Sequence, residues 1–450
     1  MLGNFFLLTR SLAAWLLFST LVIATLALGA NRPVSWTLLC LAILGLFVIT
    51  QVLYITQKSP RVFLRLWFPA GLFLGALIWG ALQTAPGFFP DAWAHPVWDL
   101  AAGVPSHVSA DPVKGFHILM RLSCYALVFW MALISAQDGE NAVRYLKAFG
   151  LFSTALAGFG LYAFLSGSNP ILGELASENL SASFVNRNSY ATFAGFGLIA
   201  CLGLLFRSGT MHSQGGRRAI IGLLRGIVAG GWIWIVGITL CGGAVVLSES
   251  RGGAVATAIG LIALLSTQRV KGAGAGIGPV LILGSVVLLI LLSGISGTMN
   301  RFLTTTDESG RFAIYPKVVE GIGDRPVLGH GIGAFHTAFR KYVPVEASSA
   351  EWNMAHNSYL ENIFELGLPA ALCFYLALAL IGLQLLRGVQ QRQRNRTVVS
   401  VALACFILAA VHSLFDFSLQ MPALASFFAW LLGIGYAQSF PSGSLKDGPS

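Results

Sequence analysis

The sequence predicts an all-α polytopic membrane protein, and three observations lead to this fold class. Of the 450 residues, 56% are hydrophobic and only 10% are charged, whereas about a quarter of the residues of a soluble domain are charged. The mean hydropathy is +0.74, and apolar runs of about 20 residues, enough to cross a bilayer, recur along the chain. Glycines are scattered within these runs, which suits close helix packing in lipid. These features exclude the water-soluble class, and the short alternating segments of a membrane β-barrel are absent.

The apolar runs divide into about twelve predicted transmembrane helices. In chain order they cover residues 11–30, 34–55, 66–83, 116–136, 148–166, 190–206, 226–247, 252–267, 277–294, 358–386, 397–415 and 420–438. The first run ends in small residues that resemble a signal-peptide cleavage site. Because this run is long for a signal sequence, we expect it to remain as the first helix.

The distribution of charge orients these helices. With the N-terminus inside, most Lys and Arg and few acids fall on the cytoplasmic side. The basic residues are Arg10, Lys58, Arg61, Arg65, Arg144, Lys147, Arg207, Arg217, Arg218, Arg225, Arg269, Lys271, Arg387, Arg392, Arg394, Arg396 and Lys446. The positive-inside rule therefore predicts that both termini are cytoplasmic. The net charge of +10 reflects this topology, and no nucleic-acid partner is expected.

We expect residues 1–440 to form a single transmembrane domain, followed by a disordered cytoplasmic tail at 441–450. Two outer loops are long. Residues 84–114 are rich in Pro, Trp and His and are predicted to lie at the membrane interface. Residues 299–357 form a longer loop, inserted before the tenth helix. Within it, residues 310–322 have apolar side chains at helical spacing, which predicts a short helix on the membrane surface.

Three arginines of the outer face are candidates for binding an anion. Arg251 lies between two apolar runs with almost no loop, where a cation needs either an acidic partner such as Glu249 or an anionic ligand. Arg187 directly precedes the sixth helix, whose backbone N–H groups would also favour a phosphate. Arg311 begins the predicted surface helix. Arg121, one turn inside the fourth helix, is expected to extend to the outer interface.

The densest group of polar residues begins at His356. Asn357, Glu361 and Glu365 recur at every fourth position, so they are predicted to share the face of one helix that descends from the outer surface. A carboxylate at the depth of Glu365 is costly unless it is paired, and an arginine is its expected partner. His356 lies at the mouth of this row, and the unperturbed pKa of a histidine side chain, about 6.5, would suit a general base for a sugar hydroxyl.

Other outer residues are candidates of lower rank. Gly329–Phe335 has the glycines of a nucleotide loop but neither its lysine nor its strand–helix context, so a flexible turn is favoured. His330 and His336 remain supporting candidates. His412 and Asp416 could form a buried pair or a proton relay, and a structural role is favoured. No metal site is predicted, because no cluster has ligand spacing, and no cofactor is expected.

Short motifs of this chain occur in one order. They are Asn186-Arg-Asn188, Ser248-Glu-Ser-Arg-Gly252, Gly310-Arg-Phe312 with Asp324–Phe335, and His356–Gly367. In this order and spacing they resemble the O-antigen ligase and O-antigen polymerase superfamily of bacterial envelope membrane proteins. The motifs cover roughly Phe184–Pro369, and the helix count and the long late loop extend the likeness to most of the chain.

The resemblance implies a glycosyltransferase of the bacterial inner membrane with its active site facing the periplasm. Its donor would be a glycan on an undecaprenyl diphosphate carrier. Arg187, Arg251 and Arg311 would bind the diphosphate, and the last two would also act in catalysis by neutralising the charge of the leaving group. His356 would orient or deprotonate the acceptor hydroxyl for an inverting attack. No metal would be needed, since the arginines supply the charge stabilisation.

Alternatives remain open at this stage. The acceptor would be lipid A–core in a ligase and a lipid-linked repeat in a polymerase, and the shared motifs do not separate the two. A secondary transporter would place ionisable groups near the bilayer midplane, whereas here they gather on one face. A flippase for the same lipid diphosphate would keep the arginines but would not need His356.

Overall fold

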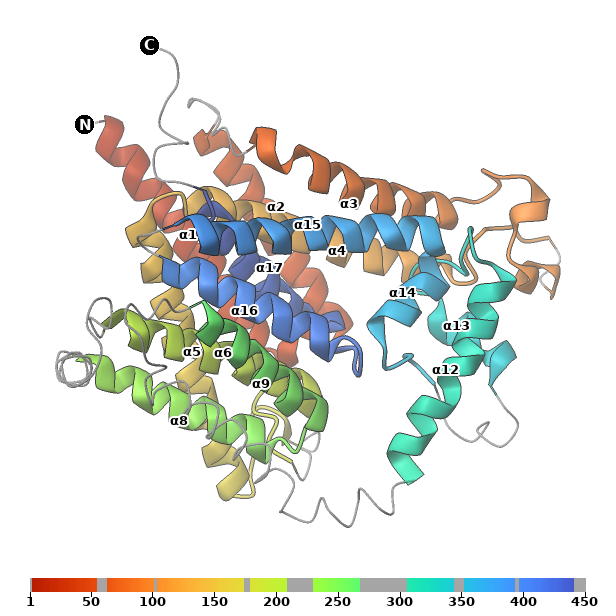
Figure 1. Cartoon of the computed structure of the whole chain (residues 1–450). Coiled ribbons are helices and arrows are strands. Elements are labelled where there is room, and N and C mark those ends of the chain that lie inside the picture. The colour runs from red at the N-terminus through yellow and green to blue at the C-terminus, as the bar shows by residue number, and fades with distance from the viewer. Residues whose placement is uncertain are drawn as a thin grey trace.

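The computed structural model describes residues 2–54, 63–100, 103–173, 179–208, 230–267, 306–343, 352–392 and 396–440. Within these ranges the chain forms helices joined by turns, and no strand occurs in them. Figure 1 shows a helical bundle with a smaller group of short helices at one end. The predicted all-α fold class is confirmed for the described ranges.

The centre of the bundle is its best covered part. It contains α6 (Arg187–Ser208), α16 (Arg396–His412) and α17 (Pro422–Ala437). Every residue of α17 is buried, and this helix packs against α4 (Pro112–Ser135). Because α17 is apolar on all sides and enclosed, it acts as the core around which the other helices are placed.

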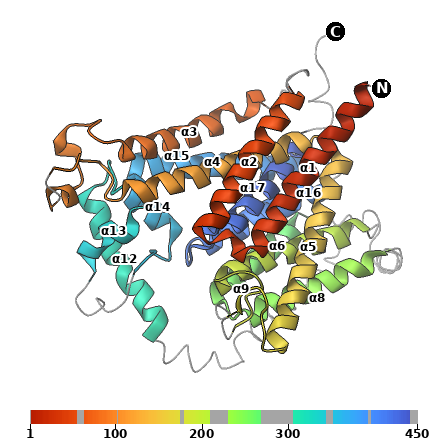
Figure 2. The same cartoon turned by 180° about the vertical axis from the view of Figure 1, so that it is seen from behind.

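The surrounding helices fall into two groups. The first contains α1 (Leu2–Leu26), α2 (Pro33–Tyr54), α3 (Phe63–Thr84) and α15 (Leu368–Gln391), and the second contains α5 (Gly139–Leu165), α8 (Trp232–Leu247) and α9 (Arg251–Ser266). Figure 2 shows α1 and α2 from behind; α1 packs against α17, and α2 packs against α1 and α4. Large apolar side chains such as Leu38, Trp67 and Leu372 are exposed, as expected of surfaces that contact lipid.

The number of membrane spans is settled only in part. Six described helices are long and apolar enough to cross a membrane, and five shorter apolar helices accompany them. The predicted ninth helix, 277–294, and the predicted tail, 441–450, lie outside the described residues. The count of twelve and the orientation therefore stay predictions.

One end of the bundle gathers the ends of several helices. After α17, Gln438 donates to the carbonyl of Ala136 at 2.6 Å and accepts from Arg392 at 2.6 Å, so α4, α15 and α17 end together. The first residues of α1 lie at this same end (Figure 1). The loops with the candidate site residues lie at the opposite end, which we call the outer end.

A layer of short elements covers the outer end. This outer layer consists of η2 (Asp91–Trp93), η3 (Pro96–Leu100), α12 (Thr306–Asp324), α13 (Phe335–Phe339), η6 (Arg340–Tyr342) and α14 (Ser358–Leu366). It has its own apolar core, which includes Val318, Phe335 and Phe364. The helix predicted at 310–322 is observed as α12, which is longer at both ends.

Several predicted helix boundaries are wrong, and the first helix, predicted at 11–30, is observed at Leu2–Leu26. Residues 358–386 do not form one helix, because Gly367, with φ 76° and ψ 162°, separates α14 from α15. A Cβ at Gly367 would collide with the carbonyl of Val327, so this bend requires glycine. The fifth helix begins at Gly139 instead of 148, because Asp138 caps its first backbone N–H groups.

Candidate functional site

His356 and Asp416 meet at the outer end of the bundle. His356 Nδ1 lies 3.6 Å from Asp416 Oδ1, and the side chains are 21% and 1% exposed. Neither of these two atoms has a hydrogen-bond partner within the described ranges, and their separation is slightly longer than a hydrogen bond. A partly exposed histidine that faces a buried carboxylate is suited to act as a general base.

The loop after α16 holds the Asp416 carboxylate in place. Ser418 Oγ donates to Asp416 Oδ2 at 2.6 Å, and Ser358 Oγ donates to the Asp416 carbonyl at 3.0 Å. Burial alone would raise the pKa of Asp416, but the neighbouring His356, His412 and Ser418 together lower it below its ordinary value. Asp416 is therefore ionised beside the imidazole at neutral pH.

The backbone at His356 has an uncommon conformation. Its φ is 54°, a left-handed value that few residues other than glycine adopt. The Tyr315 hydroxyl of α12 donates to the His356 carbonyl at 3.2 Å, and the Ser358 N–H donates to the Ser413 carbonyl at 2.9 Å. Asn357 caps α14 with its side chain. Contacts from three elements thus maintain a strained position, as is common at functional sites.

Arg187 and Arg251 each begin a helix. The Asn186 side chain caps α6 by accepting from a backbone N–H two residues further on at 2.7 Å, and Ser250 Oγ caps α9 by accepting from the Gly253 N–H at 3.2 Å. Both arginines therefore lie at helix N-termini, where the helix dipole also favours a negative charge.

These two helix starts are side by side. Glu249, two residues before Arg251, has a carboxylate oxygen 3.8 Å from Arg187 Nη1. A Cβ at Gly253 would lie 2.7 Å from the Ala191 Cβ, so α9 and α6 are in close contact there. The acid considered as a partner for Arg251 is thus found against Arg187 instead.

The end of α16 connects the arginine helices to the histidine–aspartate pair. A Cβ at Gly252 would lie 3.2 Å from the His412 ring, and His412 Nδ1 is 2.5 Å from Thr192 Oγ1 of α6. Asp416 follows His412 by one helical turn, but its carboxylate faces His356. The nearest side-chain partner of His412 is therefore Thr192 and that of the Asp416 carboxylate includes His356, while His412 also acts on Asp416 through its charge.

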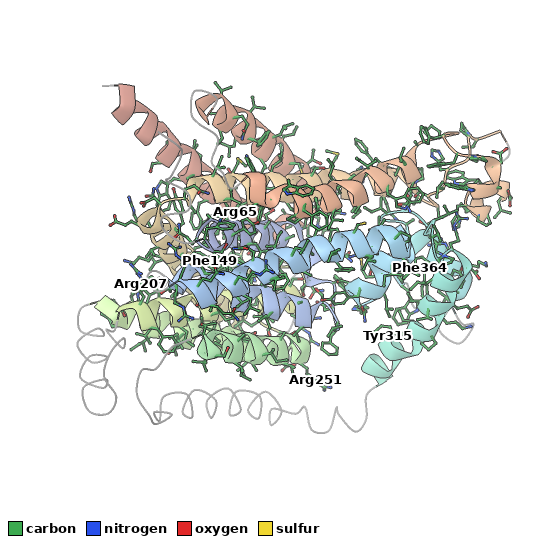
Figure 3. All side chains as sticks on the ribbon, turned by 45° about the horizontal axis from the view of Figure 1, so that its top comes forward. Arg65, Phe149, Arg207, Arg251, Tyr315 and Phe364 are labelled. Atoms are coloured by element: carbon green, nitrogen blue, oxygen red, sulfur yellow. The ribbon has the colours of Figure 1, made fainter. Side chains whose placement is uncertain are left out.

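Figure 3 shows Arg251 at the outer end of the bundle and Tyr315 on α12, which lies across from it. Arg311 belongs to α12, one helical turn before Tyr315; its side chain lies outside the described residues. Of the three candidate arginines, Arg187 and Arg251 are thus brought together, and Arg311 is located by its helix alone.

Glu361 and Glu365 are buried in α14. Glu361 accepts from the Ala355 N–H and from the Gln420 side chain, both at 2.7 Å, and Glu365 accepts from the Phe335 N–H at 3.0 Å. Neutral groups therefore donate the hydrogen bonds that these carboxyl groups accept, while the charge of Arg121 acts on Glu365 without a hydrogen bond among those described. Burial raises the pKa of both carboxyl groups above the ordinary range.

His330 is an interior residue of the outer layer. Its Nε2 lies 2.9 Å from the Gly321 carbonyl, its Nδ1 lies 3.0 Å from His95 Nε2, and its ring stacks on Phe364. Burial lowers the pKa of His330 to about 4 and that of His95 to about 3. Both rings are neutral and enclosed, which is a structural role. His336 is half-buried, with Nδ1 3.3 Å from Lys114 Nζ.

The glycine-rich turn that begins at Gly329 is a fixed support and not a flexible turn. The N–H groups of His330 and Gly331 donate to the last carbonyls of α14 at 2.9 Å. A Cβ at Gly329, which has φ 69°, would collide with the Glu365 carbonyl. Arg325 donates to three backbone carbonyls and joins this turn to residues 93–94.

Arg121 lies further inside α4 than predicted, since that helix begins at Pro112. Its guanidinium is 5.6 Å from the Trp36 ring in the first turn of α2. Across the described part of the chain, no group of three or more His, Cys, Asp or Glu is arranged to hold a metal ion.

Two features of the site were missed from the sequence. The spacing of Asp416 from His412 indicated only a pair, a relay or a structural role with that histidine, although the predicted topology already put Asp416 at the same outer face as His356. Tyr315 was read only as an apolar residue of the surface helix, and nothing in its spacing marked the hydroxyl contact with His356.

Comparison with known proteins gives one match. Residues 235–375 match the family described as O-antigen ligase, and this segment includes Arg251, Arg311 and His356. No curated protein matches the chain. The resemblance to the O-antigen ligase and polymerase superfamily that the motifs predicted is therefore confirmed over residues 235–375, which match the O-antigen ligase family.

Proposed function

We propose that the protein transfers a glycan from an undecaprenyl diphosphate carrier to a hydroxyl of an acceptor sugar at the periplasmic face of the inner membrane. The match of residues 235–375 to the O-antigen ligase family supports a membrane protein that transfers a glycan. The observation that carries the finer proposal is the His356–Asp416 pair beside two arginine-bearing helix starts.

The histidine–aspartate pair would act on the acceptor. Because Nδ1 faces Asp416, we assign its proton to that nitrogen, which leaves Nε2 to take the proton of the acceptor hydroxyl. The oxygen attacks the anomeric carbon from the side opposite the diphosphate, so the configuration inverts. The bond to the diphosphate breaks, and its electron pair leaves with the phosphate oxygen. Asp416 would stabilise the imidazolium that forms.

The arginines would act on the donor. Arg187 and Arg251 begin neighbouring helices, so their charges and the two helix dipoles would favour one anionic group. Arg311 would approach from α12. Charge grows on the departing diphosphate during transfer, and cations fixed in advance stabilise that charge without reorganisation. No step of this proposal calls for a metal.

The test separates donor binding from transfer in the purified protein. With a fluorescent lipid-linked glycan, His356→Ala should lower single-turnover transfer at least ~1,000-fold while the donor Kd changes less than about twofold. Arg251→Ala should weaken donor binding at least tenfold, about 1.4 kcal/mol. Undiminished transfer by His356→Ala would refute the catalytic assignment, and a donor that binds but is never transferred by the wild type would favour a flippase.

The acceptor is a second question, and a deletion strain answers it. If the protein is a polymerase, its loss should leave single repeats on the surface lipid when the polysaccharide is run on a gel. If it is a ligase, full-length chains should remain on the undecaprenyl carrier. A normal ladder in the deletion strain would remove the proposed function altogether.

A further inference from the structure

Glu361 is a buried carboxylate that the proposed reaction does not use. Its side chain is enclosed, with 3% of the residue exposed. Each of its two oxygens accepts one hydrogen bond: Oε2 from the Ala355 N–H and Oε1 from Gln420 Nε2, both at 2.7 Å. These donors belong to different segments of the chain, and each segment contains one member of the histidine–aspartate pair.

The first bond acts next to His356. Ala355 directly precedes His356, whose left-handed backbone conformation is costly for a residue with a side chain. Because Glu361 is buried, losing this hydrogen bond would leave a buried polar group unpaired, which is costly. The Ala355–Glu361 bond therefore fixes the backbone on the N-terminal side of His356, as the Tyr315 hydroxyl fixes its carbonyl.

The second bond acts on the Asp416 segment. Gln420 belongs to η8 (Ser418–Gln420), and Ser418 of the same turn donates to Asp416 Oδ2 at 2.6 Å. A displacement of this turn would therefore move the Asp416 carboxylate. The 3.6 Å between His356 Nδ1 and Asp416 Oδ1 is set by two segments that Glu361 joins.

We propose that Glu361 is a positioning residue that fixes the distance and orientation between His356 and Asp416. This inference rests on the proposed function, because it assigns Glu361 a task in the step that His356 would perform. Glu361 does not touch the acceptor or the donor. Its two oxygens hold the two segments in register, so its removal lowers the rate of the chemical step and leaves donor binding in place.

Three variants test this inference in the transfer assay. Glu361→Ala removes both bonds, and kcat should fall at least ~30-fold with the donor KM within about twofold of wild type. Glu361→Gln should restore at least a third of wild-type kcat: its amide oxygen can accept from Ala355, while its NH₂ group donates to a rotated Gln420 amide. Gln420→Ala removes one bond at a half-buried site and should lower kcat about fivefold.

The outcomes are distinguishable from failure of the proposed function. His356→Ala serves as the reference: if it transfers at the wild-type rate, the proposed function fails. If His356→Ala is inactive but Glu361→Ala or Gln420→Ala keeps wild-type kcat, the positioning role is refuted. It is also refuted if Glu361→Gln is as slow as Glu361→Ala, since the carboxylate would then act through its charge or its proton. If Glu361→Ala does not fold, the kcat values of Gln420→Ala and Glu361→Gln test the positioning role of Glu361 instead.

Discussion

His330 lies within the outer layer and His356 lies beside it. The two side chains differ in their exposure, in their partners and in the charge of those partners. His356 is 21% exposed and faces the carboxylate of Asp416. His330 is 2% exposed, faces the ring of His95 and a backbone carbonyl, and stacks on Phe364. Both belong to the segment that matches the O-antigen ligase family.

The difference shows how one residue type serves two purposes within one small region. An ionised partner such as Asp416 stabilises the imidazolium that forms when His356 takes up a proton. A neutral histidine partner and apolar surroundings disfavour the charged form of the His330 imidazole. His330 therefore stays neutral and has a structural role through its hydrogen bonds. The two helix starts with Arg187 and Arg251 lie on the His356 side, which adds a place for an anion there.

The largest expected effect comes from removing the feature that distinguishes His356. Asp416→Asn should lower transfer at least ~100-fold, because an amide neither stabilises the imidazolium nor fixes the proton on Nδ1. Single-turnover transfer measures this. The matched change in the other cluster is His95→Asn, which should keep transfer within about threefold per folded molecule. Equal losses of transfer in Asp416→Asn and His95→Asn would show that the two histidine clusters do not differ in their importance for transfer.

The next effect concerns the arginines beside His356. Arg187→Ala should weaken binding of the lipid-linked donor about tenfold, or 1.4 kcal/mol, because one cation of the anion site is lost. Glu249→Gln should leave binding unchanged or make it tighter, since it removes the acid that lies 3.8 Å from Arg187. Donor titration of both variants provides the measurement. Weaker binding in Glu249→Gln would mean that the ion pair, not the free charge of the arginine, supports the donor site.

Acid should destabilise the His330 cluster. The folded pKa values of His330 and His95, about 4 and about 3, lie below the 6.5 of an unperturbed histidine. Between pH 6.5 and 4 the unfolded chain therefore binds more protons than the folded one. The free energy of unfolding should fall with falling pH, by at most about 1.4 kcal/mol per unit for each histidine. Thermal unfolding in detergent at pH 7.5 and pH 5 measures the slope.

The control for this prediction is a histidine of the same layer. His330→Asn should flatten the dependence of stability on pH, whereas His336→Gln, at a half-buried site on α13, should not. A slope that His330→Asn leaves unchanged would show that other groups cause the acid sensitivity.

The smallest effect should come from the contact between α12 and His356. Tyr315→Phe removes one hydrogen bond to the His356 carbonyl, which is worth about 1 kcal/mol. We expect kcat to fall about three- to fivefold with little change in thermal stability. A loss as large as that of Asp416→Asn would mean that α12 controls the site more strongly than one hydrogen bond can explain.

Much of the fold followed from the sequence because apolar length and charge placement are local signals. The helices and the helix later seen as α12 were predicted in this way, and the orientation of the bundle stays a prediction. The break at Gly367 was missed, since an apolar run continues through it and only its contact with the Val327 carbonyl requires a bend.

The site could be predicted as a list of residues but not as a set of pairs. His356, Arg187 and Arg251 stood out because they are polar residues in an apolar chain at one face. Which groups meet depends on how α14 and the end of α16 pack. The spacing of four residues suggested His412 as a partner of Asp416, whereas the packing of the chain places the Asp416 carboxylate against His356. The same reason explains why neutral groups donate the hydrogen bonds that Glu361 and Glu365 accept.

The central claim is that His356, and not His330, performs the proton transfer. The most direct measurement compares His356→Asn with His330→Asn for glycan transfer per folded, donor-binding molecule. We predict that His356→Asn retains less than about 1% of wild-type transfer, a loss of at least about 2.7 kcal/mol of transition-state stabilisation, while His330→Asn retains at least a third. The reverse order, or equal activity in the two variants, would contradict the account.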